Sequence, residues 1–317
     1  MKRKIAVTTS EVSEGQIKKI ASAAPAFDVL HGEDAAANIG ECEVIFGHAG
    51  HDLLARAKNL KWLHSFSAGV EHYLKPEAKL AESVILTNSA GMHGVSISEH
   101  MIGMCLMLMR RLHNYYAQQN RHEWKYLGNV RSIYKSNVTV VGLGGIGSHF
   151  ASRCKALGAV VYGVVRTPRK DVPDCADKIF TVQELDEAIE NADVVALTLP
   201  GTAETKCMFD KNRMLKMKKG AIIINIGRGT AIEQDALIEL LGNGHIGGAG
   251  LDVTDPEPLP TDSKLWDFEN VIITPHISGG GTLPITVDFI VDRFIAYLKD
   301  YVDGKPFEKV VDRKSGY

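Results

Sequence analysis

Three side chains suited to acid–base or anion-binding chemistry follow apolar runs in the second half of the 317-residue chain. Arg228 follows the run 221–226, Glu257 lies in GLDVTDPEPLP, and His276 follows NVIITP. If these runs are strands of one parallel sheet, their carboxyl ends share an edge and the side chains converge there. A guanidinium binds a carboxylate and polarises a neighbouring carbonyl, while an imidazole transfers a proton and a nearby carboxylate favours its cationic form. The trio therefore predicts proton-coupled chemistry at a carbonyl beside a carboxylate.

The stretch VTVVGLGGIG, residues 138–147, has the glycine spacing of a dinucleotide-binding turn. A helical pattern follows it, and a second apolar run at 160–165 completes a βαβ unit. In such a unit the first glycine forms the tight turn, the second lets a pyrophosphate approach the backbone, and the third lets the helix pack on the strand. The phosphates of the dinucleotide then lie at the helix N-terminus. The alternative is a glycine turn without a ligand. The expected contacts are Gly142, Gly144, Gly145, Ile146 and Gly147.

The second strand of this unit lacks the acidic residue that usually holds the ribose of NAD. The run 160–165 is followed by RTPRK, which contains no carboxylate. Arg166, helped by Arg169 or Lys170, is suited to pair with a 2′-phosphate instead. We therefore expect NADP(H) to be preferred, with NAD(H) possible, and Arg166 and Thr167 to contact the cofactor. The alternative is that these cations are solvated loop charges.

Short β-branched runs alternate with helical patterns along most of the chain, which predicts parallel sheets with crossover helices. Two long helices, roughly 95–120 and 283–302, bracket the second set of runs. We therefore expect an α/β fold of two doubly wound parallel-sheet domains, the second inserted into the first. The predicted boundaries are 1–102 with 283–317 for a discontinuous substrate-binding domain, and 103–282 for the dinucleotide-binding domain. The expected strands are KIAVTT, CEVIFGH, LKWLHSF, SVILTN, VTVVGLG, VVYGVV, DVVALTLP, AIIINIG, GAGLDV and NVIITPH.

Composition excludes several classes of partner. The chain is 45% hydrophobic and 23% charged with a net charge of −2, which gives no electrostatic signature for nucleic acid or a membrane surface. The five cysteines are scattered without a C-x-x-C pair, as in a reducing cytosol, and MKRKIAVTTS has no signal-peptide core. His48 and His51 have H-x-x-H spacing without a further ligand nearby. We expect a cytoplasmic protein that binds no metal, nucleic acid or membrane.

In these motifs the chain resembles the D-isomer-specific 2-hydroxyacid dehydrogenases over nearly its whole length. The shared segments are GLGGIG, LPGTAETKCMFD, MKKGAIIINIGRGT, GGAGLDVTDPEPLP and NVIITPHISGG, with SAGVEHY and TNSAGMHGVSISEHMIGMCLMLMRR before them. The resemblance implies a flavodoxin-like substrate domain and a Rossmann domain with a cleft between them, usually paired into a homodimer through the cofactor domain. In lacking the ribose-binding acid, the chain resembles the NADPH-preferring glyoxylate and hydroxypyruvate reductases of this family.

The resemblance also implies roles for individual residues. Arg228, Glu257 and His276 are the expected catalytic trio, and Asp252 is expected to orient the nicotinamide carboxamide. Substrate binding is expected from Arg228 and from the backbone N–H groups of Ala68, Gly69 and Val70. Further cofactor contacts are expected from Pro200, Thr205, Ile226, Gly227, Asp252 and His276.

We therefore expect hydride transfer between NADP(H) and a small 2-oxo or 2-hydroxy acid of the glyoxylate or hydroxypyruvate class, with a D-product. One alternative is a non-catalytic NAD(P) sensor similar to the co-repressors that resemble this family, which the sequence disfavours because we see no added binding domain or long tail. Another is a phosphoglycerate-type dehydrogenase, which needs a cationic pocket for the substrate phosphate. Taken singly, Arg228 fits an interdomain salt bridge, Glu257 a solvated acid and His276 a core imidazole.

Overall fold

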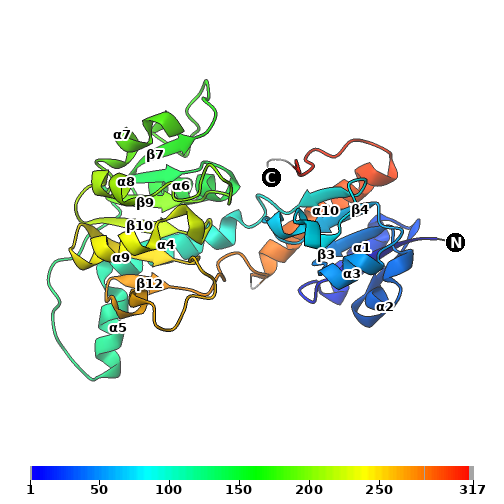
Figure 1. The fold of residues 1–317 in the computed structure, drawn as a ribbon, viewed down its shortest axis with the longest axis horizontal. Coiled ribbons are helices and arrows are strands. Elements are labelled where there is room, and N and C mark those ends of the chain that lie inside the picture. Colours follow the sequence, from blue (N-terminus) through cyan, green and yellow to red (C-terminus); the bar gives the residue numbers. More distant parts are fainter. Residues whose placement is uncertain (1, 282, 314–317) are drawn as a thin grey trace. The chain divides into compact units, whose positions relative to one another are not determined.

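The computed structural model describes residues 2–281 and 283–313 and divides into two compact units (Figure 1). The first unit consists of Met1–His93 with Gly280–Tyr317, and the second is Gly94–Gly279. Each contains one parallel sheet with helices on both faces, which confirms the predicted α/β fold. Within the described ranges, no helix is both long and apolar enough to cross a membrane.

The sheet of the second unit has seven strands in the order β12-β11-β10-β9-β6-β7-β8, and every neighbouring pair is parallel. The order reverses at β6, the first strand of the unit, which is the topology of a Rossmann fold. All carboxyl ends therefore lie at one edge. The strands are β6 (Asn137–Val141), β7 (Val160–Val165), β8 (Lys178–Thr181), β9 (Val194–Leu197), β10 (Ala221–Asn225), β11 (Ile246–Leu251) and β12 (Val271–Ile273).

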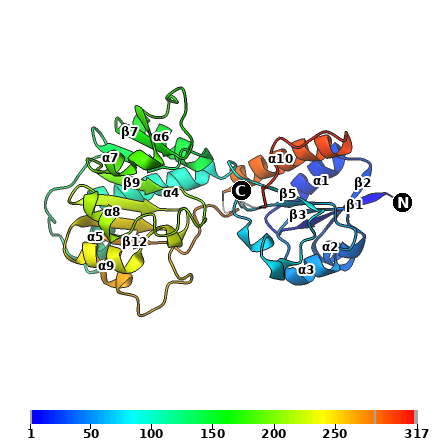
Figure 2. The ribbon, with the colours of Figure 1, turned by 45° about the horizontal axis from the view of Figure 1, so that its top comes forward.

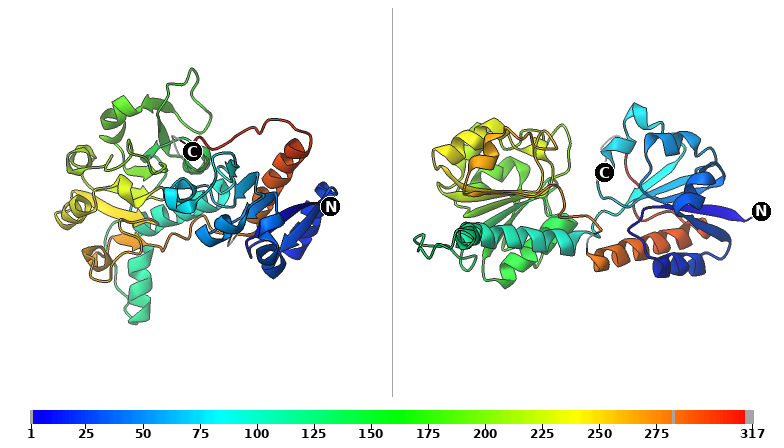
Figure 3. Two further views of the ribbon diagram at one scale, coloured as in Figure 1. Left: turned by 45° about the vertical axis from the view of Figure 1, so that its right-hand side comes forward. Right: turned by 90° about the horizontal axis from the view of Figure 1, so that it is seen from below.

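Helices α4 and α6 pack on one face of this sheet, and α7, α8 and α9 pack on the other (Figure 3). Because side chains alternate along a strand, Ile222 and Ile224 of β10 face the first group while Ile223 faces the second. The helices are α4 (Gly94–Arg110), α5 (Leu112–Asn120), α6 (Gly145–Ala156), α7 (Leu185–Ile189), α8 (Lys211–Lys216) and α9 (Gln234–Gly242), with 3-10 helices η4 (Val182–Glu184), η5 (Gly229–Ala231) and η6 (Lys264–Asp267).

The second unit begins at Gly94, the first residue of α4, and not inside this helix at the predicted boundary 102/103. The reason is packing, since α4 contacts α6, β10 and β11 and its buried residues join their core. The single helix expected over 95–120 is also wrong. It is two helices, because Arg111 has φ 56° and ends the first in a left-handed conformation.

The sheet of the first unit has five parallel strands in the order β2-β1-β3-β4-β5. This is the order of flavodoxin-like folds, in which ligands bind beyond the carboxyl ends of the strands. The strands are β1 (Arg3–Thr8), β2 (Phe27–His31), β3 (Val44–Gly47), β4 (Trp62–Ser65) and β5 (Ile85–Asn88).

Helices α1 (Glu14–Ala23) and α10 (Pro284–Val302) pack together on one face of this sheet, and α2 (Gly32–Ala37) and α3 (His51–Arg56) cover the other (Figure 2). Alternation again divides the strands, because Phe46 of β3 belongs to the first core layer and its neighbour Ile45 to the second. The 3-10 helices are η1 (Ile39–Glu41), η2 (Glu71–Tyr73) and η3 (Pro76–Ala78).

A histidine is buried inside the first unit. His64 on β4 is fully buried, with its Nδ1 atom 2.7 Å from the Thr87 hydroxyl and its Nε2 atom 3.3 Å from the Ser89 hydroxyl. The Trp62 indole also donates to the Thr87 hydroxyl, at 2.8 Å. Burial lowers the pKa of His64 to about 3, with a smaller contribution from the charge of Arg293. The imidazole is therefore neutral at physiological pH and serves the core.

Candidate active site

The predicted site residues of the second unit lie at one edge of its sheet. Six of them each follow a different parallel strand at its carboxyl end, where ligands of open α/β sheets bind. They are Gly142 after β6, Arg166 after β7, Pro200 after β9, Arg228 after β10, Asp252 after β11 and His276 after β12.

The glycine turn has the geometry that a pyrophosphate requires. Gly142 has φ 101°, where a side chain is strained, and a Cβ added to Gly147 would overlap the Gly142 carbonyl oxygen. Gly144 is different, because a Cβ there meets nothing within 4 Å, so its backbone faces open space. Gly144 is also the N-cap of α6 and makes no side-chain cap. A helix N-terminus that begins at such an open glycine is suited to bind an anion.

The cationic loop after β7 is attached to this turn. The Arg169 guanidinium donates to the Leu143 carbonyl at 3.1 Å, within the glycine turn itself. Arg166 and Thr167, at the end of β7, have exposed side chains. The position that holds an acid in many NAD sites is thus occupied by cations beside the glycine turn.

Three other predicted cofactor contacts have roles inside the protein. The Thr205 hydroxyl is buried and donates to the Pro200 carbonyl at 2.7 Å, so it fixes the loop after β9. The Ile226 side chain packs in the core shared with α4 and α6, which leaves its backbone to face a ligand. Gly227 allows the loops after β9 and β10 to touch, since a Cβ there would lie 2.5 Å from the Leu199 carbonyl oxygen.

A buried asparagine shapes the turn that carries Arg228. Asn225, at the end of β10, accepts from the Gly227 N–H at 3.1 Å through Oδ1 and donates to the Arg228 carbonyl at 2.9 Å through Nδ2. The Arg228 guanidinium also donates to the Gly227 carbonyl at 2.8 Å, and this side chain is half-buried. The sequence reasoning missed Asn225, although an amide that ends a run of buried aliphatic residues was a usable signal.

His276 and Glu257 are brought together, as their types and positions predicted. The His276 Nδ1 atom lies 3.0 Å from Glu257 Oε2, and Oε1 of the same carboxylate accepts from the Thr254 N–H at 3.1 Å. His276 has φ 53°, so the turn after β12 holds it in a left-handed conformation. The loop that carries Arg228 touches the loop that carries Glu257, because a Cβ on Gly229 would overlap the Thr254 carbonyl.

Asp252 organises the turn that carries His276. Its Oδ1 atom accepts from the Thr274 hydroxyl at 2.6 Å and from the Ile277 N–H at 3.0 Å, and its Oδ2 atom accepts from the Ser278 N–H at 3.1 Å. Burial raises the pKa of Asp252, but hydrogen bonds from Ser278, Thr274 and the turn N–H groups outweigh it and lower the pKa overall. The carboxylate is therefore ionised and directed into the turn, while its implied contact with the nicotinamide stays a prediction.

In the first unit, the segment Ala68, Gly69 and Val70 follows β4. The Asn88 side chain donates to the Ala68 carbonyl at 2.7 Å, and the Tyr73 N–H donates to the Val70 carbonyl at 2.9 Å. These bonds engage the carbonyl groups of the loop. Among the residues that the structure describes, none accepts a hydrogen bond from the N–H groups of 68–70, which leaves three donors for an anion. Asn88 was not singled out from the sequence.

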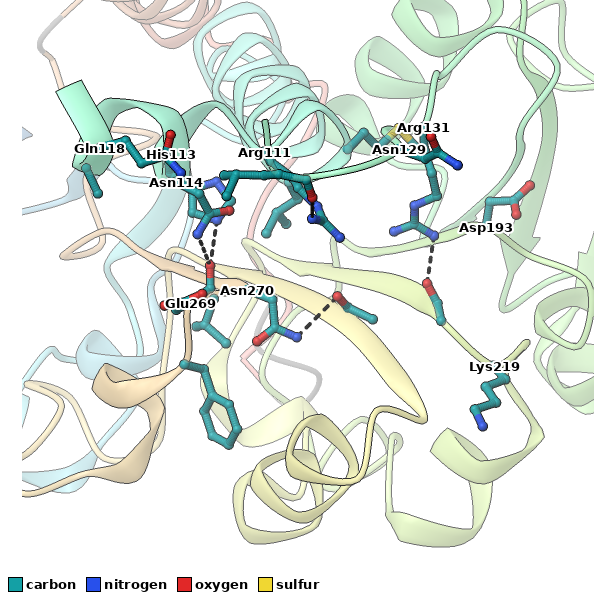
Figure 4. Close-up of a pocket in the computed structure, with 18 of the residues that line it drawn as sticks. Arg111, His113, Asn114, Gln118, Asn129, Arg131, Asp193, Lys219, Glu269 and Asn270 are labelled. Carbon is teal, nitrogen blue, oxygen red and sulfur yellow. Dashed lines mark hydrogen bonds between the residues drawn. The ribbon is translucent and has the colours of Figure 1, made fainter. Parts of the chain in front are cut away.

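A cavity of about 1130 Å³ lies away from these residues, at the amino ends of the strands (Figure 4). Its lining includes Gly220 before β10 and Asn270 before β12, and the α5 residues His113 and Asn114 both donate to the Glu269 carbonyl there. Arg131 crosses it to the Gly220 carbonyl at 2.7 Å. The cavity is thus on the edge opposite to the site.

The predicted H-x-x-H pair gives no metal centre in the described part of the chain. His48 lies in the loop after β3 and His51 begins α3. No group of three His, Cys, Asp or Glu side chains in the described ranges is arranged to hold a metal ion.

Comparison with known proteins gives the family. Residues 102–278 match the family model for the D-isomer specific 2-hydroxyacid dehydrogenase, NAD binding domain, so the chain belongs to this family of oxidoreductases. A D-isomer specific 2-hydroxyacid dehydrogenase family protein from Aeromonas salmonicida is 32% identical, with a TM-score of 0.86 over 99% of this chain and 100% of that one.

Two further relatives bear on the activity. An NADPH-dependent glyoxylate/hydroxypyruvate reductase from Sinorhizobium meliloti, solved in complex with NADP and sulfate, is 27% identical, with a TM-score of 0.83 over 100% of both chains. The D-3-phosphoglycerate dehydrogenase of Bacillus subtilis is 36% identical over 71% of this chain. The match covers only 42% of that enzyme, so the chain spans less than half of its length.

Proposed function

We propose that this protein reduces a small 2-oxo acid of the glyoxylate or hydroxypyruvate class with NADPH and gives a D-hydroxy acid. The observation that carries the proposal is the pair of His276 and Glu257, joined at 3.0 Å beside the turn that presents Arg228. The family supplies the reaction class. The Sinorhizobium reductase supports the choice of substrate and cofactor within that class, because it matches the whole chain.

The chain's own residues divide the chemistry among them. Glu257 engages Nδ1 of His276, so we assign proton transfer to Nε2. Glu257 is itself fixed by the Thr254 N–H, which orients the imidazole and stabilises its charge while the proton is present. Arg228 is assigned to the substrate carboxylate and to the alkoxide that forms as the carbonyl is reduced. The N–H groups of 68–70 in the first unit are donors suited to a carboxylate.

The residues present fit a dinucleotide. The turn from Gly142 to Gly147 would hold its pyrophosphate, and Arg166 with Arg169 would hold a 2′-phosphate. When bound, the nicotinamide supplies the hydride to the carbonyl carbon. The preference for NADPH rests on the cations at the end of β7 and on the contact of Arg169 with the Leu143 carbonyl.

A second candidate is a dehydrogenase acting on 3-phosphoglycerate, which the similarity to the Bacillus enzyme favours. A third is a nicotinamide sensor in which turnover is incidental. The second candidate differs from the first in its substrate, because a phosphate-bearing substrate needs additional cations near the loop 68–70. The third differs from both in that it turns over no 2-oxo acid efficiently.

A substrate panel tests the proposal. Glyoxylate, hydroxypyruvate, pyruvate and 3-phosphohydroxypyruvate are each assayed with NADPH and with NADH, following absorbance at 340 nm. We expect the highest kcat/KM with glyoxylate or hydroxypyruvate and NADPH. A higher value with the phosphorylated substrate would select the second candidate. Tight NADPH binding without turnover of any 2-oxo acid would select the third.

We also propose that the protein is a cytoplasmic homodimer paired through the second unit. Three aromatic side chains stand out on α5 and the loop after it, since Trp124 is fully exposed and Tyr116 and Tyr126 are more than half exposed. Exposed aromatic clusters of this kind are typical of protein interfaces. Light scattering coupled to size exclusion tests this, and the Trp124→Ser variant should shift the mass toward one 34.6 kDa chain.

A further inference from the structure

Helix α4 holds the turn that carries His276 at two points. The Ser96 hydroxyl donates to the Ser278 carbonyl at 2.8 Å, and the His100 Nε2 atom lies 3.0 Å from the Thr274 hydroxyl oxygen. Ser96 and His100 are four residues apart and therefore project from the same face of the helix. Their partners stand two residues before and two residues after His276, so α4 grips the turn on both sides of the imidazole.

The direction of each hydrogen bond follows from the protons available. Thr274 has one hydroxyl proton, and it goes to the Asp252 carboxylate at 2.6 Å, which is ionised and can only accept. The Thr274 oxygen must therefore accept from His100, which requires a proton on Nε2 of that imidazole. His100 also stands 3.9 Å from Asp252 Oδ1, so the carboxylate favours a donor at this position.

The contacts from α4 add to the bonds that Asp252 and the end of β11 make with this turn. Strand β12 has three residues and lies at the edge of the sheet, where it pairs with β11. His276 is half exposed at its side chain and has a left-handed backbone that a non-glycine residue adopts at a cost. Asp252 binds the turn through its carboxylate, whose Oδ1 atom accepts from the Ile277 N–H and from the Thr274 hydroxyl. His100 fixes the orientation of this hydroxyl.

We propose that His100, assisted by Ser96, is a positioning residue for proton transfer by His276. It acts through Thr274 and Asp252 on the turn and has no contact with the reacting atoms. The proposal rests on the function proposed above. Its direct consequence is that removal of the His100 donor misplaces the His276 imidazole without altering the glycine turn where the cofactor would bind. A displacement of about 1 Å is enough to cost about two orders of magnitude in rate.

Steady-state kinetics with matched variants test this consequence. His100→Leu should lower kcat about 10- to 100-fold with the KM for NADPH unchanged. His100→Gln, whose side-chain amide can donate in place of Nε2, should recover kcat to within about threefold of wild type. Glu99→Gln, one residue earlier on an exposed face of α4, is the control and should keep wild-type kcat. Wild-type kcat in His100→Leu, or failure of His100→Gln to exceed His100→Leu, would overturn the proposal.

A measurement without turnover separates this proposal from the proposed function. Long-range ¹H–¹⁵N correlation spectra of the full chain labelled at histidine nitrogens report which ring nitrogen carries the proton. We expect a protonated Nε2 at His100, and a shift of the His276 ring signals in His100→Leu and Thr274→Val but not in Glu99→Gln or Thr274→Ser. An unprotonated Nε2 would refute the hydrogen-bond chain even if the enzyme turns over. If the wild-type protein shows no turnover of any 2-oxo acid, the proposed function is refuted. The spectra then still test whether His100 positions the His276 imidazole.

Discussion

Replacing Gly144 with alanine should separate cofactor binding from folding. Gly144 has φ −81° and ψ −163°, which alanine adopts without strain, and its Cβ would meet nothing within 4 Å. At an N-cap, alanine costs about 0.5–1 kcal/mol relative to glycine. The lower entropy of the unfolded alanine chain returns about 0.4–1 kcal/mol. The two contributions nearly cancel, so the free energy of unfolding should stay within about 0.5 kcal/mol of wild type.

Cofactor affinity should respond very differently. The open space at Gly144 is where a pyrophosphate would approach the first N–H groups of α6. A methyl group there should weaken at least one charge-assisted hydrogen bond, which is worth about 1.5–3 kcal/mol. The Kd for NADPH should therefore rise by about 10- to 100-fold. Fluorescence titration of NADPH gives the Kd, and thermal unfolding without cofactor gives the Tm.

Gly147→Ala is the matched control, because the two glycines differ only in their surroundings. A Cβ on Gly147 would overlap the Gly142 carbonyl oxygen and lie 2.8 Å from the Thr198 hydroxyl. Such overpacking costs about 1–3 kcal/mol and should lower the Tm by roughly 2–12 °C. The reasoning is refuted if Gly144→Ala binds NADPH like wild type, or if it loses as much stability as Gly147→Ala.

Three further predictions concern single side chains. His276→Ala should lower kcat for 2-oxo acid reduction by roughly 10²–10⁴-fold, and a wild-type rate would exclude His276 from proton transfer. Arg166→Gln should lower kcat/KM for NADPH by about 10-fold or more and leave the value for NADH unchanged, whereas equal losses would exclude a 2′-phosphate contact. His64 has a pKa of about 3 in the folded state against an ordinary 6.5, so the unfolded chain binds its proton first as the pH falls. Stability should therefore fall between pH 6.5 and 3, with a slope of up to about 1.4 kcal/mol per pH unit that denaturant titrations of His64→Gln should lack.

Most strands of both sheets were predictable because they are continuous apolar runs, as parallel strands buried on both faces must be. The two missed strands are β2, FDVLH, and β8, KIFT, which end their sheets. Edge strands are partly exposed, so polar residues interrupt their apolar pattern and the signal weakens. The break between α4 and α5 was also missed, because it depends on the left-handed Arg111 and not on a glycine or proline.

In the site, too, some features could be predicted from the sequence pattern and others depend on packing. Topology alone places residues that end parallel strands at one edge, and so the sequence could anticipate that His276 and Glu257 would meet. The supporting residues could not be anticipated in that way. The contacts of Asn225 with its turn, and of Asp252 with Thr274 and His100, depend on which groups the fold buries and leaves to be satisfied.

The bond between Ser96 and Ser278 also bears on how the chain is assembled. Ser96 stands just after the point where the chain enters the second unit, and Ser278 just before the point where it leaves. The two ends of this inserted unit are therefore fastened side by side. A domain whose two ends lie side by side can be inserted into one loop of another domain without separating the ends of that loop. The second unit is thus closed at its ends by the bond between Ser96 and Ser278, two residues after His276.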